Sequence, residues 1–106
     1  MLPDKIKLYL DVDKNWIDKG KTANGYECPV ALSIVEELTR LGYEPVQNLL
    51  VLRTGVRCVL RDDKGDLFRC YGNTSKRMER FIISTDSGET TKPSRFRLTL
   101  RSEDRV

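Results

Sequence analysis

The sequence predicts a small α+β domain in which an antiparallel sheet carries its helices on one face. Three observations support this class. Residues 5–12 and 95–101 alternate between apolar and polar side chains, a helical apolar stripe follows Pro29, and a turn at 62–66 separates two further alternating segments. A chain of 106 residues is expected to form one domain, residues 1–106, around one core.

The first element is expected to be a half-buried strand over residues 5–12. One face carries Ile6, Leu8, Leu10 and Val12, and the other carries Lys5, Lys7, Tyr9 and Asp11. Residues 13–27 are mostly polar and contain two glycines, which predicts a loop. Trp16 and Ile17 of this loop are expected to fold back onto the core.

A helix is predicted over residues 29–41. Pro29 suits the first helical position, where a missing N–H costs nothing, and Gly42 suits the left-handed residue that ends a helix. The apolar stripe between them faces the core, because a small sheet needs a helix to cover one face. It consists of Val30, Ala31, Ile34, Val35, Leu38 and Leu41.

The main β region is expected after residues 42–45. Thr54 and Gly55 interrupt its alternation, as a tight turn or a bulge. Leu49 and Val51 fall on the open face of the sheet, part of which is therefore expected to be covered. The opposite, core face carries Leu50, Leu52, Val56, Cys58 and Leu60.

Residues 62–66, Asp-Asp-Lys-Gly-Asp, predict a hairpin with Gly65 in the left-handed position of a three-residue loop. This loop sets the register of the two flanking strands. Cys58 and Cys70 are then cross-strand neighbours, expected to be buried and reduced. The same register pairs Leu60 with Phe68, Arg57 with Tyr71, Val59 with Arg69 and Arg61 with Leu67.

Residues 73–84 predict a short helix capped by Asn73 or Thr74, with Met78, Phe81 and Ile82 buried; a strand beginning at Phe81 is the alternative. The last strand alternates Phe96, Leu98 and Leu100 with Arg95, Arg97, Thr99 and Arg101. The tail 102–106 is expected to fray. The resulting order, β-α-β-β-α-β, predicts a ferredoxin-like sheet with strand order 4-1-3-2 and both helices on one face.

The composition limits the classes of function that are expected for this chain. The chain has no histidine, which removes the commonest general base near neutral pH. Its three cysteines include no close pair, so structural zinc and a disulfide framework are not expected. We expect a non-enzymatic protein without a metal or cofactor. No apolar run is long enough for a membrane span and no signal peptide is recognisable, so we expect a cytoplasmic protein.

Asp11, near the end of the first strand, and Asp13, just beyond it, form a carboxylate pair. Over these few residues the segment resembles the opening motif of haloacid-dehalogenase-like phosphatases, but the chain lacks the larger core of that family. As a calcium loop the segment fails, because Trp16 stands where glycine is needed and Thr22 where a glutamate is needed. We therefore interpret both aspartates as solvated or loop-capping groups.

Positive charge gathers in the second half of the chain. Residues 53–101 carry 12 basic and 6 acidic side chains, whereas residues 1–52 carry 6 basic and 8 acidic ones. With the last strand beside the first, the open face is expected to be basic, with two tyrosines. Such a face can bind phosphates and stack unpaired bases. Its residues are Lys5, Lys7, Tyr9, Arg57, Arg61, Arg69, Tyr71, Arg95, Arg97 and Arg101.

A second basic cluster opens the helix predicted after residue 73. Lys76, Arg77 and Arg80, together with the helix and hairpin before them, resemble the start of the last helix of the double-stranded RNA-binding domain. The resemblance covers about half of the chain. The histidine-bearing loop of that family is absent, and this chain has strands at both ends. Lys76 and Arg77 are nevertheless candidates for contact with nucleic acid.

The sequence thus leads to two functional hypotheses. The first is a small basic protein that binds RNA or single-stranded DNA through its sheet face. The second is a protein-binding regulator or inhibitor, of the kind made by phages or mobile elements, that docks on an acidic partner. A homodimer formed through the sheet face or an edge strand is a further possibility.

Overall fold

The computed structural model describes residues 4–20 and 25–105, which form a mixed α+β domain with an antiparallel sheet and three helices. None of these helices is long and apolar enough to cross a bilayer. The elements in chain order are β1 (Lys5–Val12), α1 (Lys14–Lys19), α2 (Pro29–Arg40), β2 (Glu44–Val51), β3 (Gly55–Arg61), β4 (Leu67–Asn73), α3 (Lys76–Asp86) and β5 (Ser94–Arg105).

The strand order is β1-β5-β4-β3-β2, and every neighbouring pair is antiparallel. The predicted ferredoxin-like order is therefore not confirmed, because the last strand, not the first, lies inside the sheet. The reason is the length of β5. It pairs with β1 along Ser94–Arg101 and continues as strand to Arg105, where it pairs with β4. Residues 102–105, which we expected to fray, provide that second pairing, whereas Val106 lies outside the described residues.

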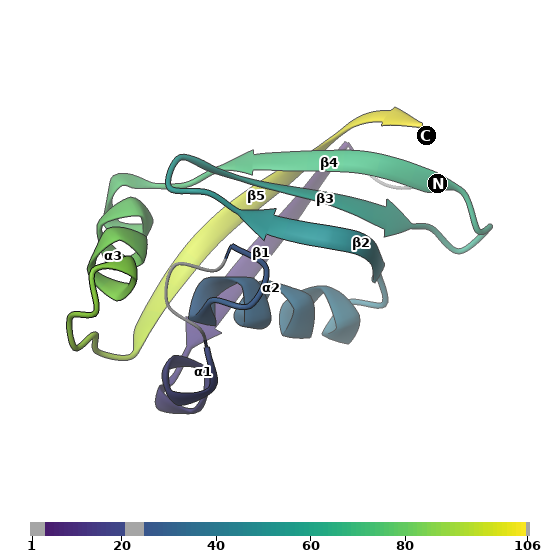
Figure 1. The fold of residues 1–106 in the computed structure, drawn as a ribbon. Coiled ribbons are helices and arrows are strands. Elements are labelled where there is room, and N and C mark those ends of the chain that lie inside the picture. The colour runs from purple at the N-terminus through teal and green to yellow at the C-terminus, as the bar shows by residue number, and fades with distance from the viewer. Residues whose placement is uncertain (1–3, 21–24, 106) are drawn as a thin grey trace.

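The sheet is strongly curved around α2. In Figure 1, β1 and β5 run at a steep angle to β2, β3 and β4, and α2 lies beneath them. Helix α2 packs against both β1 and β2, which are the two edge strands of the sheet. The side of the sheet turned away from α2 is therefore its convex side, which we call the outer face.

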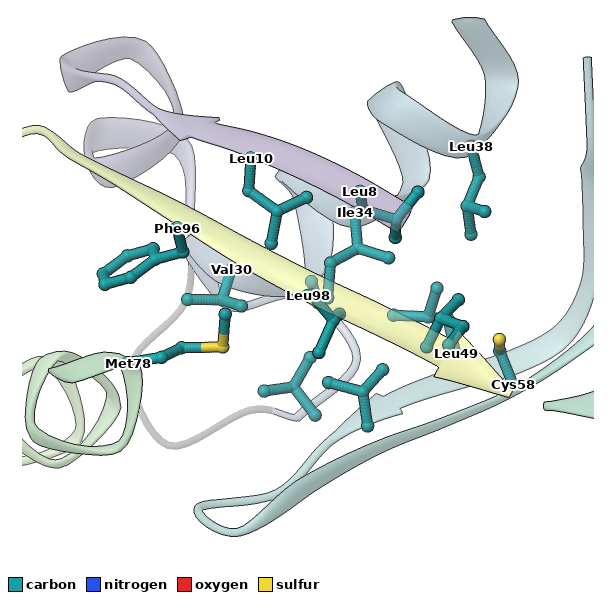
Figure 2. Packing of buried hydrophobic residues seen from close by; sticks show 14 of the residues in the cluster. Leu8, Leu10, Val30, Ile34, Leu38, Leu49, Cys58, Met78, Phe96 and Leu98 are labelled. Carbon is teal, nitrogen blue, oxygen red and sulfur yellow. The ribbon is translucent and has the colours of Figure 1, made fainter. Parts of the chain in front are cut away.

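The core fills the concave side. Figure 2 shows side chains from α2, β1, β5, α3 and the β2–β3 region converging on one interior. The predicted pattern of the first strand is confirmed, with Leu8 1% and Leu10 2% exposed. Trp16 and Ile17 pack against this cluster as expected.

Helix α2 forms close to where the sequence predicted it. Cys28 caps it by accepting a hydrogen bond from the Ala31 backbone N–H at 3.4 Å, and Pro29 occupies the first turn. Gly42, with φ +90°, follows the helix end in the left-handed conformation. The prediction that the whole stripe faces the core is wrong for two residues, because Val35 is 37% and Leu41 is 41% exposed.

The β3–β4 hairpin has the predicted register. Cys58 lies opposite Cys70, Leu60 opposite Phe68 and Arg57 opposite Tyr71. The Asp62 backbone N–H donates to the Asp66 carbonyl at 3.0 Å, and Gly65 has φ +85°. Asp62 also accepts from the backbone N–H groups of Lys64 and Asp66, both at 2.9 Å, which holds the loop closed.

The segment before this hairpin differs from the expectation. The interruption at Thr54 and Gly55 is a turn between two separate strands, β2 and β3, in which the Leu52 N–H donates to the Gly55 carbonyl at 2.7 Å. Because the chain reverses there, one alternation does not continue through it. Leu49 and Val51 are buried in the core, whereas Leu52 is 42% exposed.

The structure differs from two further expectations, the loop after the first strand and the N-cap of the helix after residue 73. Residues 14–19, expected to be loop, form α1, because Asp13 accepts a hydrogen bond from the Trp16 backbone N–H at 3.0 Å. Residues 21–24 of that predicted loop lie outside the described residues. The helix predicted after residue 73 is confirmed as α3, with Met78, Phe81 and Ile82 buried, but Ser75 is its N-cap.

Strands β4 and β5 separate beyond their short pairing, and Gly72 lies at that point. A Cβ atom on Gly72 would lie 2.6 Å from the Thr99 carbonyl oxygen and 3.1 Å from side-chain carbons of Leu98 and Leu100. Glycine is therefore needed for the close approach of the two strands.

The free edge of β1 is met by a carboxylate from α2. Glu37 is 9% exposed, and the backbone N–H of Tyr9 hydrogen bonds to it. Arg40 Nε donates to Glu37 Oε1 at 2.5 Å. The Arg40 hydrogen bond holds the pKa of Glu37 below its ordinary value of 4.5, and the Tyr9 N–H acts in the same direction. Glu37 thus satisfies a backbone donor that has no strand partner.

Replacing Glu37 with alanine is expected to destabilise the fold. The Tyr9 N–H loses its acceptor, which should lower the unfolding free energy by about 1–3 kcal/mol at pH 7. A carboxylate with a lowered pKa stabilises the fold above its unfolded value of 4.5, and this contribution is lost as the pH falls through the folded pKa. The difference between wild type and Glu37→Ala should therefore shrink below pH 4.5 in urea titrations.

Glu44→Ala is the matched control. The Glu44 side chain is 66% exposed, and its Oε2 pairs with Arg61 Nε at 3.2 Å on the surface. Such pairs contribute about 0–1 kcal/mol. Equal losses in the two variants would contradict the role given to Glu37.

Gly72→Ala is expected to lower the unfolding free energy by about 1–3 kcal/mol, because the added methyl group must displace backbone or buried leucine. Asn73→Ala, at an exposed neighbouring position, should change it by less than about 0.5 kcal/mol. Chemical denaturation measures the unfolding free energy of both variants and of the wild type. A Gly72→Ala protein as stable as wild type would show that β4 and β5 can move apart without cost.

Candidate nucleic-acid interface

A row of side chains crosses the outer face on four adjacent strands. Lys5 of β1 lies opposite Arg101 of β5, Arg101 lies opposite Tyr71 of β4, and Tyr71 lies opposite Arg57 of β3. The three basic residues are exposed and Tyr71 is half-buried. Period-2 alternation turns all four side chains to the same side of the sheet. The row therefore places Arg101 and Arg57 on either side of one aromatic ring, with Lys5 beyond Arg101.

The β1–β5 ribbon extends this basic surface. Lys7 lies opposite Thr99, and Tyr9 opposite Arg97. Tyr9 is 61% exposed, and the guanidinium of Arg97 lies 5.8 Å from the centre of its ring, within the range of a cation–π contact. Asp11 lies opposite Arg95 at the end of the ribbon and brings a negative charge there.

A hollow of about 650 Å³ lies beside the row, over β3, β4 and the end of β5. Arg57, Arg69, Tyr71, Val59 and Glu103 line it, and Cys58 and Cys70 complete its floor. It offers two guanidinium groups, an aromatic ring and an apolar side chain. Glu103 places one carboxylate among them.

Three of the predicted residues do not join this surface as free cations. Arg61 pairs with Glu44 at 3.2 Å, so its charge is offset. Lys76 and Arg77 lie on α3, which packs against the core at the end of the sheet. Arg77 donates to the Arg95 backbone carbonyl and covers the Phe96 ring at 4.8 Å. The nine other predicted residues lie on the outer face: Lys5, Lys7, Tyr9, Arg57, Arg69, Tyr71, Arg95, Arg97 and Arg101.

The buried thiols are placed for packing. Cys58 and Cys70 are free, buried and in contact, as predicted. The Cys58 thiol donates a hydrogen bond to Cys70 Sγ, and this bond together with burial raises the pKa of the Cys58 thiol. Burial also raises the pKa of Cys28, the cap of α2. Cys28 and Cys58 are therefore protonated, in the unreactive form, at neutral pH.

The two carboxylates at the end of the first strand, Asp11 within β1 and Asp13 just after it, have separate roles. Asp13 caps α1, as its interpretation as a loop-capping group implied, and Asp11 is exposed opposite Arg95. Among residues 4–20 and 25–105, no group of three or more His, Cys, Asp and Glu side chains is arranged to hold a metal ion.

Sequence reasoning missed Glu103 because the tail was expected to fray. The alternation that places Arg97 and Arg101 on the outer face continues to Glu103, so the pattern itself could have found it. The sequence also gave no role to Lys92, which lies in the loop between α3 and β5. No pattern in the sequence places that loop against the helix.

No protein family, curated protein or solved structure matches the chain.

The three native thiols are expected to react slowly with a thiol reagent such as DTNB, because each is buried and must be exposed by an opening of the fold. All three should react at once in denaturant. Asn73→Cys, which adds a thiol at an exposed position of β4, should contribute one fast equivalent and serves as the control. Fast reaction of Cys58 or Cys70 in the wild-type protein would contradict their packing role.

Proposed function

We propose that this protein is a non-enzymatic, cytoplasmic protein that binds RNA or single-stranded DNA through its outer face. The observation that carries the proposal is the row Lys5, Arg101, Tyr71 and Arg57, which spans four adjacent strands. Cations at this spacing can neutralise successive phosphates, and an aromatic ring among them can stack a base.

The shape of the face favours a single strand over a duplex. The outer face is convex, because the sheet curls around α2. A flexible single strand can follow a convex surface and turn its unpaired bases towards Tyr71 and Tyr9. The bases of a duplex are already stacked on one another, which leaves no use for these two rings.

An acidic protein partner is the second candidate. Exposed arginine and tyrosine are the residue types that dominate protein interfaces, and the hollow beside the row combines them with Val59. Such a partner would be bound by charge complementarity and would explain the same cations. Binding to nucleic acid separates the two candidates.

Short labelled oligonucleotides provide the test, by fluorescence anisotropy across a salt series. Log affinity should fall linearly with log salt, with a slope of about −0.7 for each phosphate contact on a single strand. Arg101→Ala and Arg57→Ala should each weaken binding and flatten this slope. Tyr71→Ala should cost about 1–3 kcal/mol of binding free energy through lost stacking, with the slope nearly unchanged.

Arg53→Ala is the matched control, because Arg53 is an exposed arginine in the β2–β3 turn and not part of the row. Its affinity and slope should equal those of the wild type. If no oligonucleotide binds even at low salt, the nucleic-acid proposal is wrong. A partner captured from lysate that survives nuclease treatment and is lost in Arg101→Ala would then support the protein-binding alternative.

A further inference from the structure

A second basic site lies apart from the outer face, where β4 and β5 diverge and α3 fills the gap. A shallow pocket of about 270 Å³ opens there between α3, the loop before β5 and the first residues of β5. Three cations and four hydroxyl groups line it, over a floor of two phenylalanine rings. These residues are Arg77, Arg80, Lys92, Ser84, Thr90, Thr91, Ser94, Phe81 and Phe96.

Within the part of the chain that the structure describes, no carboxylate offsets the charge of this pocket. No carboxylate lines it, and the nearby acids Asp86 and Glu89 line other hollows of the surface. Among the described residues, none forms an ion pair with Arg77, Arg80 or Lys92. Three like charges around one small pocket repel each other. A bound anion would be attracted to all three and would offset this repulsion.

The groups are held in place rather than loosely gathered. Arg77 donates to the Arg95 carbonyl while its guanidinium lies 4.8 Å from the centre of the Phe96 ring. Phe96 in turn packs edge-on against Phe81, with ring centres 5.4 Å apart. Arg77 and Arg80 are one helical turn apart, and Phe81 and Ser84 continue along the same face of α3.

The loop that supplies the other wall is tied to the end of α3. The Glu89 N–H donates to the Ser84 carbonyl at 3.0 Å, and Gly88 takes the left-handed conformation with φ +77°. Ser94 Oγ donates to the Lys92 carbonyl at 3.0 Å, which closes the other end of the loop. Thr90, Thr91 and Lys92 are thereby fixed beside the helix.

We propose that this pocket binds a phosphate monoester group. A phosphate carries close to two negative charges and three acceptor oxygens, which matches a site with three cations and several hydroxyl donors. A single carboxylate would leave much of the positive charge unbalanced. The volume is slightly below the range of about 300–1,000 Å³ of pockets that enclose whole small molecules. The pocket therefore takes the phosphate group and not an entire nucleotide.

The position of the pocket leaves two sources for that group. It can belong to a free phosphate compound. It can also be the terminal phosphate of an oligonucleotide, because Arg95, whose carbonyl Arg77 holds, carries its own side chain on the outer face. The pocket itself does not depend on nucleic-acid binding by the outer face.

The test is a titration of the full chain with inorganic phosphate at constant ionic strength, followed by amide shifts in two-dimensional NMR. Amides of residues 77–94 should shift in a saturable manner, and sodium chloride at equal ionic strength should not reproduce this. Arg80→Gln and Lys92→Gln should each weaken phosphate binding by about tenfold, a loss expected for one charge-assisted contact. Both side chains are exposed and make no other described interaction, so neither change should unfold the protein.

Arg53→Gln and Lys64→Gln are the controls, since each removes an exposed cation that belongs neither to the pocket nor to the outer-face surface; they should leave phosphate binding unchanged. Absence of a saturable shift, or equal weakening in the controls, would overturn the proposal. A second titration with 5′- and 3′-phosphorylated oligonucleotides against unphosphorylated ones identifies the source. A preference for a phosphorylated end that Lys92→Gln removes supports the terminal phosphate; saturable phosphate binding without such a preference supports the free compound.

Discussion

Helix α2 packs on β1 and β2, the two edge strands of one sheet, and the rest of the molecule is arranged around this double contact. A helix is about 10–12 Å wide, whereas five strands in a flat sheet span about 20 Å. One helix cannot cover such a sheet unless the sheet curls. The curl brings both edges to the helix, gathers the core on the concave side and leaves a continuous convex surface outside.

Strand β5 makes this curl possible, because its two halves serve different neighbours. Its first eight residues pair with β1 and its last ones with β4. Arg101 stands where the two pairings meet, which is why it has Lys5 on one side and Tyr71 on the other. Where β4 and β5 diverge, α3 packs between them. There the Arg77 side chain donates a hydrogen bond to the Arg95 carbonyl, in place of a strand partner. The two basic sites are thus both consequences of the division of β5.

The parts of this structure that depend on local sequence were predictable. The turn at 62–66 and strict alternation were enough for the register of β3 and β4, and Pro29 and Gly42 were enough for the limits of α2. The strand order was not, because the choice between β1 and β5 as neighbour of β4 depends on pairing across the whole chain. The separation of β2 from β3 stayed open, because a tight turn and a bulge at Thr54 and Gly55 both fit the alternation. The outward direction of the basic residues followed from alternation, but the pocket beside α3 required the path of a loop.

The antiparallel pairing of β1 with β5 also determines how the fold carries mechanical load. Lys5, at the start of β1, lies opposite Arg101, near the end of β5, so both ends of the chain leave the sheet on the same side. A force that draws the two ends apart acts on the β1–β5 ladder one residue pair at a time instead of shearing all pairs together. Strand β1 has no second strand neighbour, and Leu8 and Leu10 leave the core with it. Traction on the termini therefore loads two contacts of β5: its ladder with β1, which covers the hydrophobic interior, and its pairing with β4 through Ser102 and Arg105.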